Sequence, residues 1–184
     1  MQIQNAGTLG GNLCNASPAA DGVPPLLALD ARVEIADTAG SRSVALADFI
    51  LGNRTTLLRP NQLLAAILVP KPAHEARSHF LKLGAREYLV VSIAMVAATL
   101  ETETGRVRAA RIAVGACSPV ARRLPLAEAV LAGKPCDATL GEFLRAEHLA
   151  ALAPIDDVRA SGEYRLDAAL TLAKRVLSHL GAQA

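Results

Sequence analysis

The sequence predicts an α+β fold, and three observations support this prediction. Short segments of alternating apolar and polar residues are typical of strands. A longer segment rich in Val, Ile and Ala, residues 88–103, is followed by the turn Thr104-Gly105, which lets the chain return as an antiparallel strand. Apolar residues at helical spacing follow in the last third of the chain. Strands that precede a run of helices favour an antiparallel sheet with helices packed on it.

The first 72 residues are expected to hold a glycine-rich loop, two short helices and three strands. A Pro-Pro pair near the start of the first apolar run indicates a helix beginning there. Alternating residues on both sides of a Thr-Ala-Gly-Ser turn indicate two strands. The expected elements are the loop 7–12, a helix at 24–31, strands at 32–36 and 42–46, a short helix at 47–51 and a strand at 62–69.

The remaining residues are expected to form an antiparallel sheet and three helices. A Pro-containing segment, 70–76, is the expected boundary between the two parts. The last helix should place Leu166, Leu170, Ala173, Leu177 and Leu180 on one apolar face. The expected elements are an edge strand at 78–83, strands at 88–103 and 107–116, and helices at 121–131, 139–152 and 164–180.

Composition excludes several classes of protein. Hydrophobic residues at 52% with charged residues at 20% are typical of a soluble globular chain. The net charge of +2 is too small to favour nucleic-acid binding, and the longest apolar stretch, 88–100, is too short to span a bilayer. The start of the sequence does not resemble a signal peptide, which favours the cytoplasm. Cys14, Cys117 and Cys136 lie outside any CxxC motif, so neither a disulfide framework nor a metal cluster is expected.

The glycine-rich stretch near the N-terminus is the strongest candidate for a site. Three glycines fall between Gly7 and Asn12, and an apolar helical run follows. Glycines let a ligand approach the backbone N–H groups, and the start of a helix favours a negative charge. A phosphate-bearing ligand is therefore one interpretation. From composition alone, an ordinary turn is the other.

The order of residues resembles one family, the FAD-binding medium subunits of molybdenum hydroxylases such as xanthine dehydrogenase and carbon monoxide dehydrogenase. The resemblance implies that residues 1–72 are the second subdomain of a FAD-binding domain and that 73–184 form the C-terminal domain. It also implies that the first FAD subdomain, with its earlier glycine-rich loop, is absent from this chain. The motifs that carry the resemblance are Thr8-Leu-Gly-Gly-Asn12, Ala16-Ser-Pro18 with Asp21, Ser43–Phe49, Leu63–Pro70, Phe80-Leu-Lys82 with Gly84-Ala-Arg86, Arg111–Ala116 with Pro119, and Glu163-Tyr-Arg165.

The resemblance implies a partial FAD site in this chain. The loop residues would bind the FAD phosphates and ribityl region, and Leu64 would pack on the isoalloxazine ring. A cation at Lys82, close to the ring, would stabilise the reduced, anionic flavin. Ordinary structural roles remain open, such as a helix cap at Asn15 or a solvated surface lysine at Lys82. The implied FAD-binding residues are Thr8, Gly10, Gly11, Asn12, Asn15, Asp21, Leu64 and Lys82.

The implied function is electron transfer in an oxidoreductase. Electrons would pass through iron–sulfur clusters to FAD and then to NAD or another acceptor. Molybdopterin and the [2Fe-2S] clusters are expected on partner subunits only, a molybdopterin-binding large subunit and an iron–sulfur small subunit. The alternative is a truncated, non-catalytic assembly module that no longer binds FAD. A related FAD domain of cell-wall reductases is disfavoured by Arg111 and Tyr164-Arg165. The surface left uncovered without the first subdomain, including Leu9 and Leu13, is expected either to be mobile or to be covered by another copy of the chain, because exposed apolar patches favour association.

Overall fold

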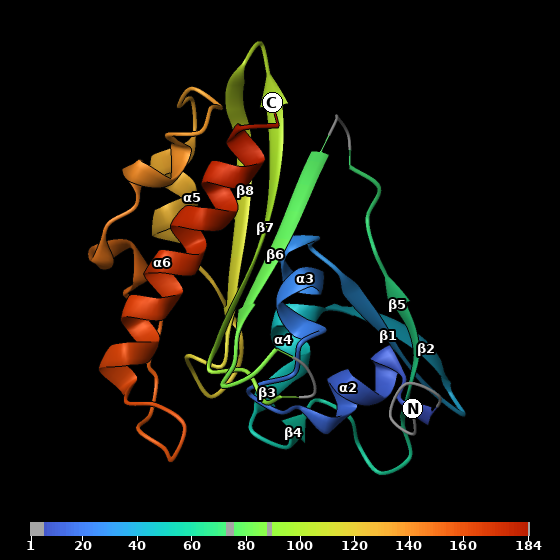
Figure 1. Ribbon diagram of the computed structural model, residues 1–184. Helices are drawn as coiled ribbons and strands as arrows, with labels where there is room; N and C mark the ends of the chain where they lie inside the picture. The colour runs from blue at the N-terminus through green and yellow to red at the C-terminus, as the bar shows by residue number, and fades with distance from the viewer. Residues whose placement is uncertain (1–5, 73–75, 88–89, 184) are drawn as a thin grey trace.

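A computed structural model of the chain describes residues 6–72, 76–87 and 90–183. Its centre is a four-stranded antiparallel sheet in the order β6-β7-β8-β9. Figure 1 shows helices α5 and α6 on one face of this sheet and the short helix α3 on the other. A three-stranded sheet, β2-β1-β5, and a small hairpin, β3-β4, lie beside α3. The predicted α+β class is confirmed.

The elements of the first part follow the predicted order, with two differences. The helix expected at 24–31 and the three strands are present within a few residues of their expected bounds. The hairpin β3-β4 was not predicted, and the expected loop 7–12 is wrong, because most of it is the first turn of a helix. The observed elements are α2 (Leu9–Asn15), α3 (Val23–Ala28), β1 (Arg32–Asp37), β2 (Gly40–Ala45), α4 (Leu46–Phe49), β3 (Ile50–Gly52), β4 (Thr55–Thr56) and β5 (Leu63–Leu68).

Helix α2 forms because Thr8 caps it. The Thr8 hydroxyl oxygen accepts a hydrogen bond from the N–H of Gly11 at 2.9 Å, as expected of a threonine at the N-cap. Among the described glycines, a positive φ occurs at Gly40, Gly105 and Gly133 and not in this segment. The glycines of α2 therefore keep its surface open and do not serve to bend the chain.

The second part contains the predicted sheet, with β6 at its edge as expected. The strand expected at 88–103 begins only at Ala94, and residues 88–89 lie outside the described part. The Ile93 N–H still donates to the Leu83 carbonyl at the end of β6 at 2.8 Å, while the Ile93 carbonyl accepts a hydrogen bond from Arg165. The observed elements are β6 (Ala76–Leu83), β7 (Ala94–Glu103), β8 (Arg106–Gly115), β9 (Arg122–Arg123), α5 (Pro125–Leu131), two 3₁₀ helices, η1 (Leu140–Phe143) and η2 (Ala146–Leu149), and α6 (Gly162–Gly181).

Two of the three predicted helices need correction. The helix expected at 121–131 starts only at Pro125, because residues 122–123 pair with β8 as β9. The single helix expected at 139–152 is wrong: η1 and η2 are separated by Leu144 in an extended conformation. Gly141 lies directly against the backbone of α6, and a Cβ there would overlap the Lys174 carbonyl. The two short turns bury Leu140, Leu144 and Leu149 under this constraint.

The hydrophobic core crosses the predicted boundary at 70–76. One cluster lies between the central sheet and the layer of α5 and α6. The other lies around α3 and joins Val33 and Phe49 of the first part to Ala97 and Ala113 on the opposite face of the sheet. Because α3 packs on strands of the second part, the two parts share one interface. The division into 1–72 and 73–184 stays a prediction.

Candidate functional site

The start of α2 forms a small, open surface. The Thr8 side chain occupies the N-cap, so the first-turn N–H groups of Leu9 and Gly10 have no acceptor within the helix. Gly10 lies against Leu64 of β5, and a Cβ on Gly10 would stand 3.6 Å from the Leu64 Cδ2 atom. Leu9 and Gly10 therefore offer N–H groups and the positive end of a helix dipole to an anion, whereas the Gly11 N–H is taken by Thr8.

The two asparagines of α2 face different parts of the molecule. The Asn12 side-chain oxygen accepts a hydrogen bond from the N–H of Gly22 at 3.1 Å, which joins α2 to the start of α3. Asn15 lies at the other end of the helix, where its side chain accepts a hydrogen bond from Arg54. The structure therefore brings Asn12, but not Asn15, to the side of α2 that leads to Asp21.

A second group of polar side chains forms around Asp21. Lys82 of β6 makes an ion pair with Asp21 and also donates a hydrogen bond to the Val90 carbonyl at 2.9 Å. The buried Ser92 hydroxyl donates to the other Asp21 oxygen at 2.6 Å. Asp21 directly precedes Gly22, so this group is connected to Asn12 of α2. Sequence reasoning named Asp21 and Lys82 separately and missed Ser92, which it placed inside a strand.

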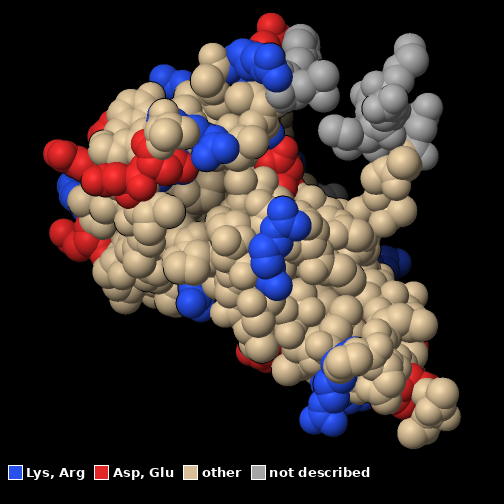
Figure 2. All heavy atoms as spheres, turned by 90° about the horizontal axis from the view of Figure 1, so that it is seen from below, with Lys and Arg blue, Asp and Glu red and all other residues tan. Residues whose placement is uncertain are grey.

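The leucines of α2 differ from the expectation. Leu9 is 47% exposed, but Leu13 is fully buried in the core around α3. The apolar surface expected from both residues is therefore reduced to Leu9, and self-association stays a prediction. On the face of the molecule seen from below, Lys and Arg are interspersed with Asp and Glu, and most of the surface is uncharged (Figure 2). This face offers no extended basic surface of the kind that binds nucleic acid.

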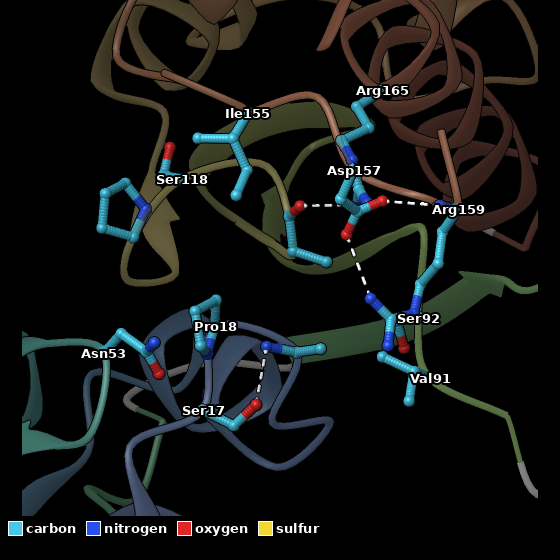
Figure 3. Close-up of a pocket in the computed structure, with 13 residues that line it drawn as sticks. Ser17, Pro18, Asn53, Val91, Ser92, Ser118, Ile155, Asp157, Arg159 and Arg165 are labelled. Carbon is cyan, nitrogen blue, oxygen red and sulfur yellow. Dashed lines mark hydrogen bonds and ion pairs between the residues drawn. The ribbon is translucent and has the colours of Figure 1, made fainter. Parts of the chain in front are cut away.

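A pocket of about 470 Å³ adjoins the Asp21 group through Ser92. Figure 3 shows Ser17, Pro18 and Asn53 on one side of it and the segment before α6 on the other. The lining residues come from both parts of the chain: Ser17, Pro18, Ala19, Asn53, Val91, Ser92, Ala116, Ser118, Pro119, Ile155, Asp157, Arg159 and Arg165.

Arg165 of α6 organises the far wall of this pocket. Its side chain is 5% exposed and donates to the carbonyl of Ile93 at 2.6 Å, to that of Ala116 at 3.0 Å and to Asp157 Oδ1 at 2.8 Å. The backbone N–H of Arg159 and the Arg165 guanidinium lower the pKa of Asp157 to about 2. The family motif Glu163-Tyr-Arg165 contains Arg165, but the sequence analysis assigned Arg165 no role.

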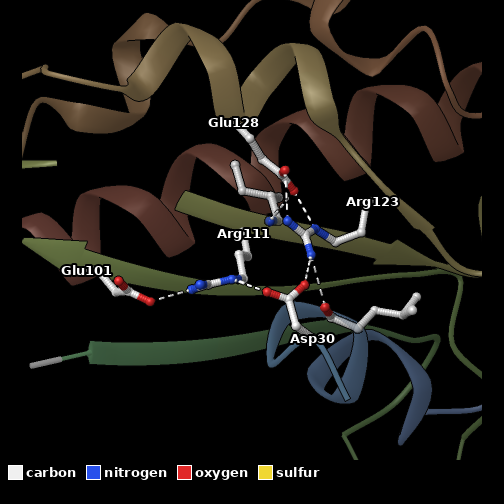
Figure 4. A network of polar contacts seen from close by, with 7 residues as sticks. Asp30, Glu101, Arg111, Arg123 and Glu128 are labelled. Atoms are coloured by element: carbon white, nitrogen blue, oxygen red, sulfur yellow. Dashed lines mark hydrogen bonds and ion pairs between the residues drawn. The ribbon is translucent and has the colours of Figure 1, made fainter. Parts of the chain in front are cut away.

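A separate ion-pair network joins α3 to the central sheet (Figure 4). Asp30, just after α3, pairs with Arg111 of β8 and with Arg123 of β9, the latter at 2.6 Å. Arg111 also pairs with Glu101 at 2.8 Å. Arg123 donates to Glu128 of α5 at 2.8 Å. This network holds the position of α3, which lies between α2 and the sheet.

The described part of the chain has neither a candidate metal site nor a candidate membrane span. No group of three or more His, Cys, Asp or Glu side chains there could hold a metal ion. In the same residues, no helix is long and apolar enough to cross a membrane. Cys117 is buried, and desolvation raises the pKa of its thiol to about 11, which keeps it protonated.

Two family models match this chain. The FAD-binding domain in molybdopterin dehydrogenase matches residues 1–72, and the CO dehydrogenase flavoprotein C-terminal domain matches residues 79–180. The chain is 32% identical over 184 residues to the xanthine dehydrogenase FAD-binding subunit of Escherichia coli O157:H7. It is 30% identical over 185 residues to the carbon monoxide dehydrogenase medium chain of Afipia carboxidovorans. Each match covers 100% of this chain and 63% of the relative.

Solved structures of similar proteins share the fold. Reconstituted CO dehydrogenase from Oligotropha carboxidovorans matches with a TM-score of 0.90 at 29% identity. Quinoline 2-oxidoreductase from Pseudomonas putida 86 matches with a TM-score of 0.87 at 32% identity. Both matches cover 100% of this chain and 64% of the solved one. The chain thus spans just under two thirds of the length of these relatives.

Proposed function

The chain belongs to the family of FAD-binding medium subunits of molybdenum hydroxylases, and we propose that it helps to bind FAD in such a subunit. The FAD would receive electrons from iron–sulfur clusters and pass them to NAD or another acceptor. Molybdopterin and the [2Fe-2S] clusters would lie on a large and a small partner subunit. Support comes from the two family models, which match residues 1–72 and 79–180.

The observation that carries this proposal is the open surface at the start of α2. A flavin dinucleotide carries two phosphates. The first turn of α2, capped by Thr8, offers N–H groups that have no acceptor within the helix, and they lie next to Gly10 and Gly11. Gly10 faces Leu64, whereas Gly11 is exposed, so a ligand can approach the backbone at Gly11. The residues present therefore fit a phosphate.

The remaining predicted residues would orient the flavin. Lys82 carries a positive charge on β6 and is held by Asp21 and the Val90 carbonyl. A cation held in this way would stabilise negative charge on a reduced flavin ring. Leu64 of β5 lies next to Gly10 of α2 and would pack on the apolar flavin ring. Asn12 would hold α2 next to the turn that carries Asp21, because its side chain accepts a hydrogen bond from the N–H of Gly22.

Substitution of Gly10 by alanine tests the proposal, in the flavoprotein subunit of native length. Gly10→Ala adds a methyl group between the first turn of α2 and Leu64, where it makes an ordinary van der Waals contact and narrows the space beside the backbone that the phosphates would approach. Alanine favours a helix over glycine by about 1 kcal/mol, so the melting temperature should stay equal or rise. We expect the FAD content per subunit, measured by absorbance after gel filtration, to fall at least about tenfold.

Cys14→Ala is the matched control, because Cys14 is an exposed residue on the same helix. It should change neither the FAD content nor the melting temperature. A Gly10→Ala subunit that retains the FAD content of the wild type contradicts the proposed phosphate site. A wild-type subunit of native length without FAD would instead favour the non-catalytic assembly module.

A further inference from the structure

Lys82 carries the positive charge of the candidate site, and its ammonium group keeps one donor for a ligand. A lysine ammonium group has three N–H donors. One of them bonds to Asp21, and another bonds to the Val90 carbonyl at 2.9 Å. Among the described residues, no further acceptor bonds to Lys82. The direction of the remaining N–H therefore depends on how Asp21 and the Val90 carbonyl are held.

Ser92 occupies the other oxygen of the Asp21 carboxylate. Ser92 is 1% exposed, and its hydroxyl donates to Asp21 Oδ1 at 2.6 Å, whereas Lys82 bonds to Asp21 Oδ2. Each carboxylate oxygen thus has its own partner. A hydrogen bond from a hydroxyl group to an ionised carboxylate is short and strong, so a competing donor does not readily displace it.

The segment that carries Ser92 is fixed by the residue that follows it. The Ile93 N–H donates to the Leu83 carbonyl at 2.8 Å, and the Ile93 carbonyl accepts a hydrogen bond from Arg165 at 2.6 Å. These two bonds join the segment to the end of β6 and to α6. A donor whose backbone is held in this way keeps one direction, and here that direction is toward Asp21.

Without the Ser92 hydroxyl, both oxygens of Asp21 would be open to Lys82. The last side-chain torsion of an aspartate turns easily, and the Asp21 side chain is 47% exposed, so its plane is able to rotate. The ammonium group would then donate to both oxygens. That arrangement would use the N–H that is left for a ligand, and it would neutralise more of the positive charge of Lys82.

We propose that Ser92 is a positioning residue for the flavin: it holds one Asp21 oxygen, so that Lys82 keeps one N–H for the bound ring. This inference rests on the proposed function, because the ring must lie beside Lys82 for that N–H to reach it. A donated hydrogen bond and a less neutralised cation both favour the reduced, anionic ring. Ser92 therefore raises the reduction potential of bound FAD.

Ser92→Ala tests this role in the flavoprotein subunit of native length. Asp21 stays accessible to Lys82 and to water, so no buried charge is left unpaired and the melting temperature should change little. Potentiometric titration gives the ratio of reduced to oxidised flavin at a fixed applied potential. This ratio should fall at least about fivefold, which is about 20 mV for a two-electron couple.

Ser92→Thr is the conservative variant that should restore the effect. It keeps the hydroxyl group, and its additional methyl group has room in the 470 Å³ pocket that Ser92 lines (Figure 3). The flavin ratio of this variant should stay within about twofold of the wild type. A Ser92→Thr subunit with the same ratio as Ser92→Ala would contradict the role of the hydroxyl group.

Ser118→Ala is the matched control, because Ser118 is a second buried serine that lines the same pocket. Its hydroxyl donates to the Cys117 carbonyl at 2.6 Å and accepts from the Ala153 N–H at 3.0 Å, and it makes no bond to Asp21. This variant should leave the flavin ratio within about twofold of the wild type.

A double variant tests whether Ser92 acts through Lys82. In a subunit that already carries Lys82→Ala, the change Ser92→Ala should have no further effect on the flavin ratio. An equal fall in the ratio with and without Lys82 would overturn the inference, because Ser92 would then act by another route.

The outcomes distinguish this inference from the proposed function. FAD content is measured for every variant. An unchanged ratio in Ser92→Ala, with FAD retained and with a lower ratio in Lys82→Ala, overturns the role of Ser92 alone. A wild-type subunit of native length without FAD contradicts the proposed function and this inference with it.

Discussion

Asp21 and Lys82 are 61 positions apart in the sequence, yet their side chains form an ion pair. The pair depends on β6, which carries Lys82 along the sheet edge, and on Asn12, which holds the turn that carries Asp21. The side chain of Lys82 is 26% exposed and that of Asp21 is 47% exposed, so water still reaches both. The pair is therefore accessible to a ligand and contributes modestly to stability.

Lys82→Ala should lower the reduction potential of bound flavin in the native-length subunit. Removal of the cation disfavours the reduced, anionic ring. The melting temperature should hardly change, because a partly exposed ion pair contributes only about 0–1 kcal/mol. Potentiometric titration measures the first effect and thermal unfolding the second. Lys82→Arg is the control that keeps the charge, and an unchanged potential in the alanine variant contradicts the role of Lys82.

Asp157 should make stability depend on pH in the acid range. Its pKa is about 2 in the folded chain, below the ordinary value of 3.8, because it accepts hydrogen bonds from the Arg159 backbone and from Arg165. A lowered folded-state pKa stabilises the fold above the unfolded pKa, and this contribution is lost as the pH falls from about 4 to about 2. Urea unfolding of Asp157→Asn and wild type should give a difference that shrinks over this range.

The exposed Asp48 of α4 supplies the control for that comparison. Asp48→Asn should stay within about 0.5 kcal/mol of the wild-type stability at pH 7, as expected of an exposed surface position. A constant difference between wild type and Asp157→Asn from pH 7 down to pH 2 would show that the carboxylate contributes nothing through its ionisation.

Two elements show how packing overrides local sequence signals. The glycine-rich segment was expected to be a loop, but the cap at Thr8 and the buried Leu13 make it a helix. The segment 139–152 was expected to be a helix, but α6 lies so close to Gly141 that two 3₁₀ turns replace it. In both cases a contact with another element, or a cap, outweighs the propensity of the segment.

Gly141→Ala should destabilise the contact between η1 and α6. An added Cβ would overlap the Lys174 carbonyl, which belongs to helix backbone and cannot rotate away. Overpacking of this kind costs about 1–3 kcal/mol, which urea unfolding can measure. The neighbouring Glu142 is exposed, so Glu142→Ala should stay within about 0.5 kcal/mol of wild type. Equal stability of the two variants would mean that η1 can shift away from α6.

The whole molecule is held together by α3, which packs on a sheet built from the second part of the chain. Its core contacts reach Ala97 of β7 and Ala113 of β8, and the Asp30 network fixes its end to β8 and β9. The candidate flavin residues lie on elements attached to this helix. The position of the candidate site therefore depends on the packing of α3 against the central sheet.

The chain on its own should bind FAD only weakly, although it folds. Its candidate contacts come from one helical turn and one accessible ion pair, at surface that stays in contact with water. Each hydrogen bond there nets about 0.5–1.5 kcal/mol, whereas immobilising a ligand costs roughly 4–15 kcal/mol. Calorimetry should give a dissociation constant above the micromolar range. Tight binding, or a protein that stays yellow after extensive dialysis, would disagree with this expectation.

The α+β class, most strands and the family could be predicted from the amino-acid sequence alone. These features rest on local patterns, which can be recognised without knowing how the chain folds. Examples are the alternating residues, the Thr104-Gly105 turn and the motif from Thr8 to Asn12. The helix predicted at 139–152 was wrong because the conformation of this segment depends on its contact with α6, a separate element. The site residues implied by the family motif stay a prediction, and their contacts could not be predicted from the motif.

Which of those residues contact one another depends on how distant segments pack together. The pairing of Lys82 with Asp21 and the pocket organised by Arg165 join segments that are distant in the sequence. In the folded chain, Asn15 lies away from the start of α2 and Leu13 is buried. Such contacts depend on the register of β6 with β7 and on the packing of α3 across the sheet. No periodicity within a single segment encodes them, because they arise only when distant segments bury a common core.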